Sequence, residues 1–288
     1  MYIFCKIRSI KYFGFLLYAL LLCGVFMQIR AQERLVIVGG GTRPQSAMAK
    51  FVEWAGKDRS RILIIPWATE EPESAFDYLK KDLIEFKPEA IELAPVAPMT
   101  PEKKQKFLTQ LENATGVFFT GGDQVKIMNV LKDESLLEGL RKRYAAGVVF
   151  GGTSAGTAIM SRQMITGEGD FTVIDGKKVQ TSTGLGLLPN YVIVDQHFIK
   201  RQRQNRLFGL ILQEGKFGIG IDEDTALLVT DNRFAEVTGV NQVMTVDPQR
   251  DGSLVIRLLH PGEILDLRTR RLGKKRAAKH PDTGSSSQ

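Results

Sequence analysis

Residues 148–156, Val-Val-Phe-Gly-Gly-Thr-Ser-Ala-Gly, place a serine in a tight turn flanked by glycines. The spacing of Gly152, Ser154 and Gly156 is that of a nucleophile elbow, in which small neighbours let a strained strand-to-helix turn expose the serine hydroxyl. The residues after the turn predict a short helix, whose free N–H groups favour negative charge close to Ser154. A glycine-rich turn with an incidental serine fits the same motif. Other residues of the chain are therefore needed to distinguish a nucleophile from a structural serine.

A hydroxyl nucleophile usually needs a neighbouring base, and the chain has only three histidines. His260 stands beside a Pro-Gly turn and His280 lies in a polar, basic stretch, so both are predicted to be surface residues. His197 follows the β-branched run 191–194 at the predicted end of a strand, which is where open α/β sheets place their chemistry. We therefore expect His197 to be the base, with a purely structural histidine as the alternative.

Three adjacent carboxylates, Asp222, Glu223 and Asp224, interrupt an apolar run that resumes at Thr225. One of them would orient the imidazole of His197 and stabilise its cation. A solvated acidic turn is the alternative. Spacing does not choose among the three.

Several motifs together resemble those of the cyanophycinase-type serine peptidases, a family that includes the aspartyl dipeptidase peptidase E. They occur in the family's order and span about residues 35–246, and they are Phe-Phe-Thr-Gly-Gly-Asp-Gln at 118–124, Gly-Gly-Thr-Ser-Ala-Gly at 151–156, Asp-Gln-His-Phe at 195–198 and Gly-Ile-Asp-Glu at 220–223. The resemblance implies Ser154 as nucleophile, His197 as base and Glu223 as third member of a triad. It also implies a homodimer and a class I glutamine amidotransferase-like fold.

The glycines of the motif at 118–124 offer backbone N–H groups to a substrate oxygen. Gly121 and Gly122 follow the apolar run 117–119 and permit close approach of the backbone. We expect an oxyanion hole made by the N–H of Ala155 and an N–H of this turn, assigned to Gly122. The resemblance implies that Gln124 contacts substrate, while its position also fits the first residue of a helix.

A basic segment begins four residues after His197, and guanidinium groups bind carboxylates through paired hydrogen bonds. The resemblance implies that Arg201, Arg203 and Arg206 shape a pocket for an aspartate-rich chain, although a run of basic residues is usually a solvated helix face. Cyanophycin is polyaspartate carrying arginine on each side-chain carboxyl. Asp195 is expected to meet a substrate guanidinium.

The functions that remain open are three. We favour a serine exopeptidase that acts on cyanophycin. One alternative is a peptidase that hydrolyses short aspartyl or isoaspartyl dipeptides, and the other is a catalytically silent binding protein on the same scaffold. Departures from the family pattern concern substrate preference more than chemistry: Thr157 replaces a small alanine, and Gln202, Gln204 and Asn205 separate the arginines. No cofactor and no metal are expected, because no His/Cys cluster has zinc spacing.

A glycine run at 39–41 follows the strand-like residues 35–38. If it began a dinucleotide-binding motif, the third glycine would fall at Pro44, which cannot give the close helix contact. We interpret this run as a tight turn near the active site that holds no phosphate.

Apolar runs alternate with helix-like segments through the first two thirds of the chain, which predicts a largely parallel sheet covered by helices on both faces. The expected strands are 35–38, 61–65, 117–119, 147–150, 191–194, 217–221 and 227–230, and the expected helices are 46–56, 73–86, 101–111, 124–132 and 135–146. Antiparallel strands follow, joined by the Asp-Gly turn at 249–252, and another hairpin is expected at 174–177.

The two ends of the chain differ from the body. Residues 1–31 combine three early basic residues with the apolar stretch 13–27 and a small residue, Ala31, which predicts a cleaved signal peptide and export, with an uncleaved anchor as the alternative. Cleavage there removes both cysteines and leaves no stable membrane insertion.

The net charge of +7 is located mainly at the ends, since residues 1–31 carry +4 and residues 268–288 carry +6, leaving −3 for the body. Nucleic-acid binding by the body is therefore not expected. The peptidase domain is expected at 32–267, followed by a disordered basic tail at 268–288.

Overall fold

Alternating strands and helices build the first part of the folded chain. The computed structural model describes residues 31–167, 170 and 172–273. Five strands run parallel in the order β1-β5-β4-β2-β3, and their bounds are β1 Arg34–Val38, β2 Arg61–Ile65, β3 Ala90–Leu93, β4 Gly116–Phe119 and β5 Val149–Thr153. All but the edge strand β3 are almost wholly buried, as parallel strands covered on two faces must be.

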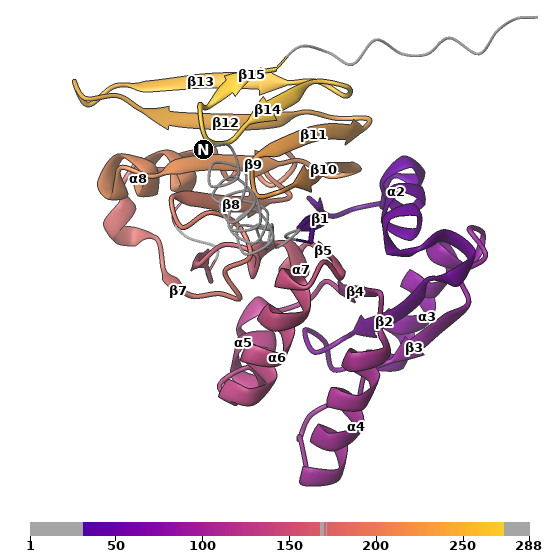
Figure 1. Cartoon of the computed structure of the whole chain (residues 1–288). Helices are drawn as coiled ribbons and strands as arrows, with labels where there is room; N and C mark the ends of the chain where they lie inside the picture. The colour runs from indigo at the N-terminus through magenta and orange to yellow at the C-terminus, as the bar shows by residue number, and fades with distance from the viewer. Residues whose placement is uncertain (1–30, 168–169, 171, 274–288) are drawn as a thin grey trace, which may run out of the picture. The chain divides into compact units, whose positions relative to one another are not determined.

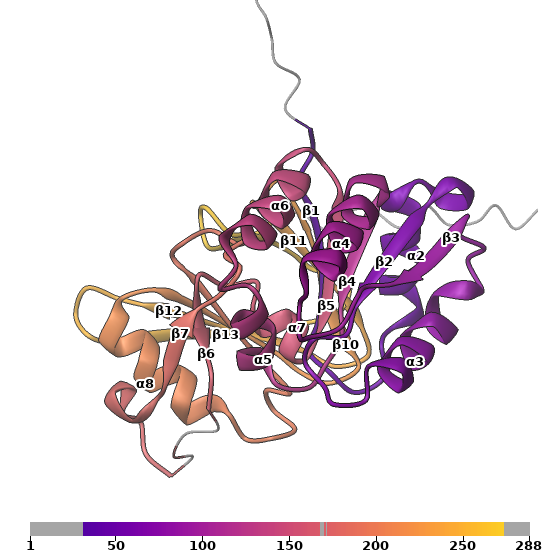
Figure 2. The ribbon, with the colours of Figure 1, turned by 90° about the horizontal axis from the view of Figure 1, so that it is seen from below.

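Helices cover both faces of this sheet (Figure 2). Because side chains alternate between the two faces along each strand, successive residues meet different helices. On one face, Val36 and Val38 pack with α2 (Gln45–Ala55) and α3 (Pro72–Ile84). On the other, Leu35 and Ile37 belong to the core with α4 (Pro101–Asn113), α5 (Gln124–Val130) and α6 (Glu134–Ala145). The predicted α/β architecture is confirmed.

Aspartate caps begin α5 and α6. The Asp123 carboxylate accepts a hydrogen bond from the N–H of Val125 at 2.7 Å and opens α5. Asp133 does the same for Ser135 at the start of α6. Such caps satisfy N–H groups that lack a partner within the helix, so they fix where each loop ends.

Antiparallel strands extend the sheet beyond β1 (Figure 1). β10 (Thr225–Thr230) pairs with β1, and β11 (Phe234–Gly239), β14 (Ile264–Asp266) and β15 (Arg271–Leu272) follow outward, which gives nine strands in all. Because β15 pairs within this sheet, the folded domain continues past the expected boundary at residue 267.

A second sheet holds two strands that the sequence pattern alone would add to the first. β8 (Val192–Gln196) and β9 (Phe217–Ile221) run parallel, and the antiparallel pair β12 (Val243–Pro248) and β13 (Leu254–Leu259) completes four strands. α8 (Gln204–Glu214) packs on one face through Leu207, Leu210 and Ile211. The expected Asp-Gly hairpin is the connection between β12 and β13.

The hairpin expected around 174–177 is present as an antiparallel pair, but without a tight turn at these residues. Gly176–Lys178 forms a turn of 3₁₀ helix instead, because the carboxylate of Asp175 accepts a hydrogen bond from the N–H of Lys177 at 3.0 Å. The strands that do pair here are β6 (Gln163–Ile165) and β7 (Thr181–Thr183), which lie farther apart in the chain.

Part of the prediction for the two ends falls on residues 1–30 and 274–288, which are outside the described residues. Within the described ranges, no helix is both long and apolar enough to cross a membrane. The described chain from Gln32 onward belongs to one compact unit.

Candidate active site

Ser154 lies between the end of β5 and the short helix α7 (Ala155–Ala158), in a backbone conformation that side chains other than glycine rarely adopt. Its φ is 51° and its ψ is −111°. The N–H of Ser154 donates to the carbonyl of Val38 at 3.1 Å, and the hydroxyl of Thr157 lies 2.6 Å from the same oxygen. A Cβ at Gly156 would overlap the carbonyl of Phe119. The turn therefore needs its small residues, and β1 anchors it from the side.

His197 follows β8 and its ring connects Ser154 to a carboxylate. Nε2 lies 2.9 Å from Oγ of Ser154, and Nδ1 lies 2.6 Å from Oε1 of Glu223. The side chain of His197 is 9% exposed and that of Glu223 is 22% exposed. The three side chains thus form one hydrogen-bonded chain that ends at the serine hydroxyl, an arrangement suited to proton transfer from that hydroxyl.

The three adjacent acids make different contacts. Oδ1 of Asp222 accepts hydrogen bonds from the N–H groups of Ile199, at 3.1 Å, and Lys200, at 2.9 Å, which fixes the turn after His197. Oδ1 of Asp224 accepts one from the N–H of Thr42 at 2.6 Å. Only Glu223 reaches the imidazole, so geometry separates residues that the spacing left equivalent.

The glycine run 39–41 supports the histidine. The carbonyl of Gly39 accepts a hydrogen bond from the N–H of His197 at 2.7 Å, and the carbonyl of Gly40 accepts one from the N–H of Asp224 at 2.9 Å. Gly40 has a φ of +117°, and a Cβ there would overlap the imidazole ring. This contact was not predicted, because sequence gave no sign that the turn touches a histidine so distant along the chain.

The surroundings of His197 favour its neutral form. Burial lowers its pKa below the ordinary value of 6.5, the hydrogen bond with Glu223 opposes that effect, and the positive charges of Arg201 and Arg203 add to the lowering. A neutral imidazole can accept a proton from the serine hydroxyl.

A small polar cavity of about 370 Å³ opens beside Ser154. Its lining includes the side chains or backbone of Gly122, Gln124, Gln180, Gln196, Arg201, Arg203 and Arg206. No hydrogen bond within the described chain uses the N–H of Gly122 or that of Ala155. Gly121 lies next to the serine, since a Cβ on it would be 3.8 Å from Oγ of Ser154. The site therefore combines a serine, a base and unused N–H donors with a cationic wall.

Comparison with known proteins identifies the family of the chain. The family model for peptidase family S51 matches residues 35–237, which is well over half of the chain. The chain belongs to peptidase family S51. It is accordingly a serine-type peptidase.

Curated relatives of this S51 peptidase include proteins named cyanophycinase. A protein named cyanophycinase from Trichormus variabilis is 35% identical over 225 residues, which cover 76% of this chain and 75% of the relative. A cyanophycinase from Geminocystis herdmanii is 33% identical over 223 residues, covering 76% and 82%. The crystal structure of a peptidase from an acI-B1 actinobacterium aligns with a TM-score of 0.62 at 22% identity over 82% of this chain and 97% of that one, which supports the fold.

Asp195 does not face the cavity of the S51 peptidase as a free acid, contrary to expectation. Its carboxylate is buried and pairs with Arg206 through Nε at 2.7 Å and Nη2 at 2.5 Å. Arg206 also donates to the carbonyl of Gly167 at 2.6 Å. An unpaired buried charge is highly unfavourable, so each member of this bidentate pair neutralises the other. Together with the bond to Gly167, the pair holds β8, α8 and the loop at residue 167 together.

The other residues expected to bind substrate differ in how far their side chains are already hydrogen-bonded to the protein. Arg203 is buried, and its Nη1 donates to the carbonyl of Gln196 at 2.9 Å. The amide nitrogen of Gln124 donates to the carbonyls of Ile165, at 2.8 Å, and Thr166, at 3.1 Å, so this residue both starts α5 and fixes the opposite wall. Arg201 is exposed, and its side chain forms no hydrogen bond or ion pair with a described residue.

Gln196 is a cavity residue that sequence reasoning missed. It is 5% exposed, and its side-chain oxygen has no hydrogen-bond partner among the described residues. Buried polar atoms are normally satisfied, so this oxygen is available to a donor inside the cavity. Its position directly before His197 at the end of a strand was the available signal.

Proposed function

We propose that this protein is an exported serine exopeptidase that hydrolyses cyanophycin to β-Asp-Arg dipeptides through an acyl-enzyme on Ser154. The observation that carries the chemistry is the hydrogen-bonded chain from Glu223 through His197 to Ser154. The substrate rests on relatives named cyanophycinase at 33–35% identity over about three quarters of the chain.

The proposed reaction begins when Oγ of Ser154 attacks a peptide carbonyl while Nε2 of His197 takes the hydroxyl proton. Glu223 orients the ring and stabilises the imidazolium that forms. The N–H groups of Ala155 and Gly122 stabilise the oxyanion of the tetrahedral intermediate, and each such donor contributes about 3 kcal/mol. His197 then gives the proton to the leaving amine. Water then attacks the acyl carbonyl while losing a proton to His197, and His197 returns that proton to Oγ of Ser154 as the ester bond breaks and the acid product leaves.

Short products fit the small cavity, whose volume of about 370 Å³ lies at the low end for small-ligand sites. In our proposal Arg201, which has no described side-chain partner, and Arg203 bind substrate carboxylate, while the free oxygen of Gln196 accepts a hydrogen bond from substrate. Arg206 and Asp195 act indirectly by holding the wall. Cleavage of aspartyl or isoaspartyl dipeptides is the second candidate, because the same cavity would accept them.

Two further parts of the proposal concern the setting of the enzyme. We propose that residues 1–31 act as an export signal, supported by their basic start and apolar stretch. We also propose a homodimer, which rests on family resemblance. Both are checked on the expressed full chain, by N-terminal sequencing of the exported product and by light scattering.

The nucleophile is tested with Ser154→Ala. We expect activity on cyanophycin to fall by several orders of magnitude, because members of a triad act as a unit. Unfolding temperature and polymer binding should stay close to those of the wild type. Ser161→Ala, which removes a buried hydroxyl that accepts from the N–H of Val194, is a matched control for hydroxyl loss. Retention of about a tenth of the activity in Ser154→Ala would contradict the assignment.

Substrate choice is tested by identifying products. Purified protein is incubated with cyanophycin and with a panel of α- and β-aspartyl dipeptides, and the products are identified by mass spectrometry. Release of β-Asp-Arg from the polymer supports the proposal, whereas cleavage of α-aspartyl dipeptides alone supports the dipeptidase.

A further inference from the structure

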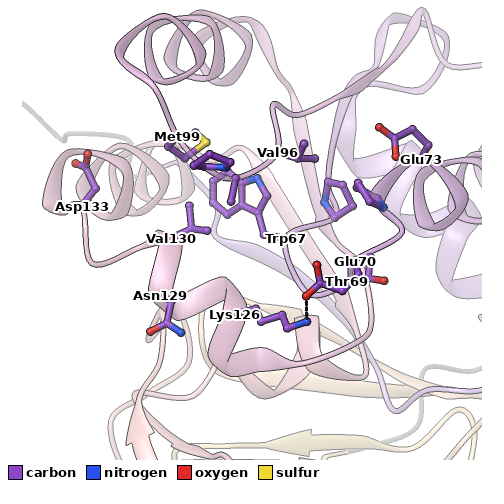
Figure 3. A pocket seen from close by; sticks show the side chains of 14 residues that line it. Trp67, Thr69, Glu70, Glu73, Val96, Met99, Lys126, Asn129, Val130 and Asp133 are labelled. Carbon is purple, nitrogen blue, oxygen red and sulfur yellow. Dashed lines mark hydrogen bonds and ion pairs between the residues drawn. The ribbon is translucent and has the colours of Figure 1, made fainter.

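A second and larger cavity lies on the other side of α5 from Ser154. Its volume is about 810 Å³, and the loops after β2 and β3 form its walls together with α5 (Figure 3). The carboxyl ends of parallel strands are where open α/β sheets bind ligands. No step of the proposed reaction uses this cavity.

The floor of the cavity is apolar and its rim is acidic. Trp67 is 5% exposed, and its Nε1 donates to the carbonyl of Pro95 at 2.8 Å, so the ring is held in place. Met99 and Val130 lie beside the indole in Figure 3. Flat apolar surface of this kind accepts planar groups and methylene stems.

The rim carboxylates are unequally engaged. Glu73 forms no hydrogen bond or ion pair with any described residue, whereas Glu70 is bonded to Lys126 and Asp133 to Lys104 at 2.7 Å. Lys126 is the single lysine or arginine among the residues that line the cavity in the described chain. An incoming cation would therefore meet Glu73 directly and compete with Lys126 for Glu70.

The two cavities share a wall. The N–H of Asp123 donates to the carbonyl of Ala68 at 2.8 Å, which joins the loop after β2 to the Gly121-Gly122 turn. Along α5, Gln124 and Val125 line the smaller cavity, and Lys126 and Val130 line the larger one. The two cavities are therefore lined by neighbouring residues of one helix.

We propose that the larger cavity is a second subsite that binds an arginyl guanidinium of the polymer while another residue of the same chain occupies the site at Ser154. This inference rests on the proposed function. A guanidinium is planar and weakly hydrated and pairs with carboxylates, which matches an apolar floor beside Glu73, a carboxylate without a described partner. A polymer with one such cation on every residue always presents one to the second subsite.

The subsite itself is tested without catalysis, by titration with L-arginine amide. The chain has two tryptophans, so Trp54→Phe makes Trp67 the fluorescent reporter. We expect a saturable change with arginine amide and none with citrulline amide, the neutral analogue. Glu73→Gln should weaken binding about two- to fivefold, as loss of an exposed charge pair does, and Lys126→Met should strengthen it. Glu112→Gln is the control, because Glu112 does not line the cavity and its side chain is 76% exposed.

Equal response to arginine amide and citrulline amide, or an unchanged affinity in both Glu73→Gln and Lys126→Met, overturns the second subsite. At the polymer level, Glu73→Gln should lower kcat/KM about two- to fivefold for long cyanophycin and leave an activated aspartyl ester, which carries no guanidinium, unaffected. Equal losses on both substrates would also overturn it. If the wild type cleaves no cyanophycin, the proposed function fails, and the arginine titration still decides the subsite.

Discussion

At the scale of single residues, neighbours of the same charge perform different tasks. Asp222 fixes the turn after His197, Glu223 meets the imidazole and Asp224 holds the N–H of Thr42. Three acidic side chains at consecutive positions thus have different partners, because each leaves the backbone in a different direction. The same division explains why Asp195, chemically suited to bind a substrate guanidinium, is engaged by Arg206 instead.

The division of tasks predicts unequal effects of removing each charge. Glu223→Gln should lower kcat by about 10³- to 10⁴-fold, because the amide no longer stabilises the imidazolium or fixes its tautomer. Asp222→Asn and Asp224→Asn keep an oxygen that accepts the backbone hydrogen bonds, so we expect losses below about tenfold and about 1 kcal/mol of stability. Steady-state kinetics of the three variants decide this, and equal losses would reassign the orienting role.

The pH dependence follows from the lowered pKa of His197. The base works when neutral, so activity is lost as pH falls through the pKa of the folded enzyme. We expect the acidic limb of kcat/KM to have its midpoint below the ordinary value of 6.5, because burial disfavours the charged ring. Arg201→Gln removes a nearby positive charge and should move the midpoint upward.

Lys200→Gln is the matched control for that shift, since Lys200 is an exposed neighbour that is not among the charges lowering the pKa of His197. A midpoint that stays fixed in Arg201→Gln, or one that moves equally in both variants, would show that Arg201 does not act on the base.

At the scale of elements, the site is assembled from turns that follow strands. β5 presents Ser154, β8 presents His197, and the loop between β9 and β10 presents Glu223. The end of β1 and the turn after it contact Ser154 through Val38 and His197 through Gly39 and Gly40, and a Cβ at Gly41 would lie 3.0 Å from Cβ of Glu223. The glycines of this turn have no side chain that could take part in a reaction, and the turn acts by fixing where the site residues lie.

The role of the turn after β1 predicts a severe effect of Gly40→Ala. The added methyl would overlap the imidazole, so His197 must move, and misplacement of about 1 Å typically lowers rates about 10²-fold. Gly252→Ala is a control, because Gly252 also has a positive φ, of +83°, yet nothing lies within 4 Å of its added Cβ. Steady-state kcat and unfolding temperature of both variants separate lost geometry from backbone strain.

Sequence predicted the elements whose signals are local. Apolar runs alternating with helix-like segments predicted most strands and helices, and residue type with spacing selected Ser154 and His197. β3 was missed because its residues are only half-buried at a sheet edge. The assignment of Glu223 needed family resemblance, and the second sheet depends on Gly218 and Gly220 fitting against Leu207 and Phe198, a contact between distant segments.

At the scale of the whole folded unit, the serine and its base come from different sheets. Ser154 follows a strand of the nine-stranded sheet, while His197 follows a strand of the four-stranded one. One hydrophobic core joins the two, since Leu35 and Ile37 of β1 belong to the same buried cluster as Val194 of β8 and Ile219 of β9. Burial of that shared surface is therefore what maintains the distance from Ser154 to His197.

The shared core predicts that the two sheets unfold together. Separating them would expose apolar side chains on both, at about 25 cal/mol for each Å² of apolar surface, so an intermediate with one sheet intact should be unfavourable. In native-state hydrogen exchange on the full chain, peptides covering β1 and β5 should show the same opening free energy as peptides covering β8 and β9. The half-buried edge strand β3 is an internal comparison and should exchange sooner. If β8 and β9 opened at markedly lower free energy while β1 stayed protected, the base would belong to a separately mobile unit, and activity would be lost before the fold.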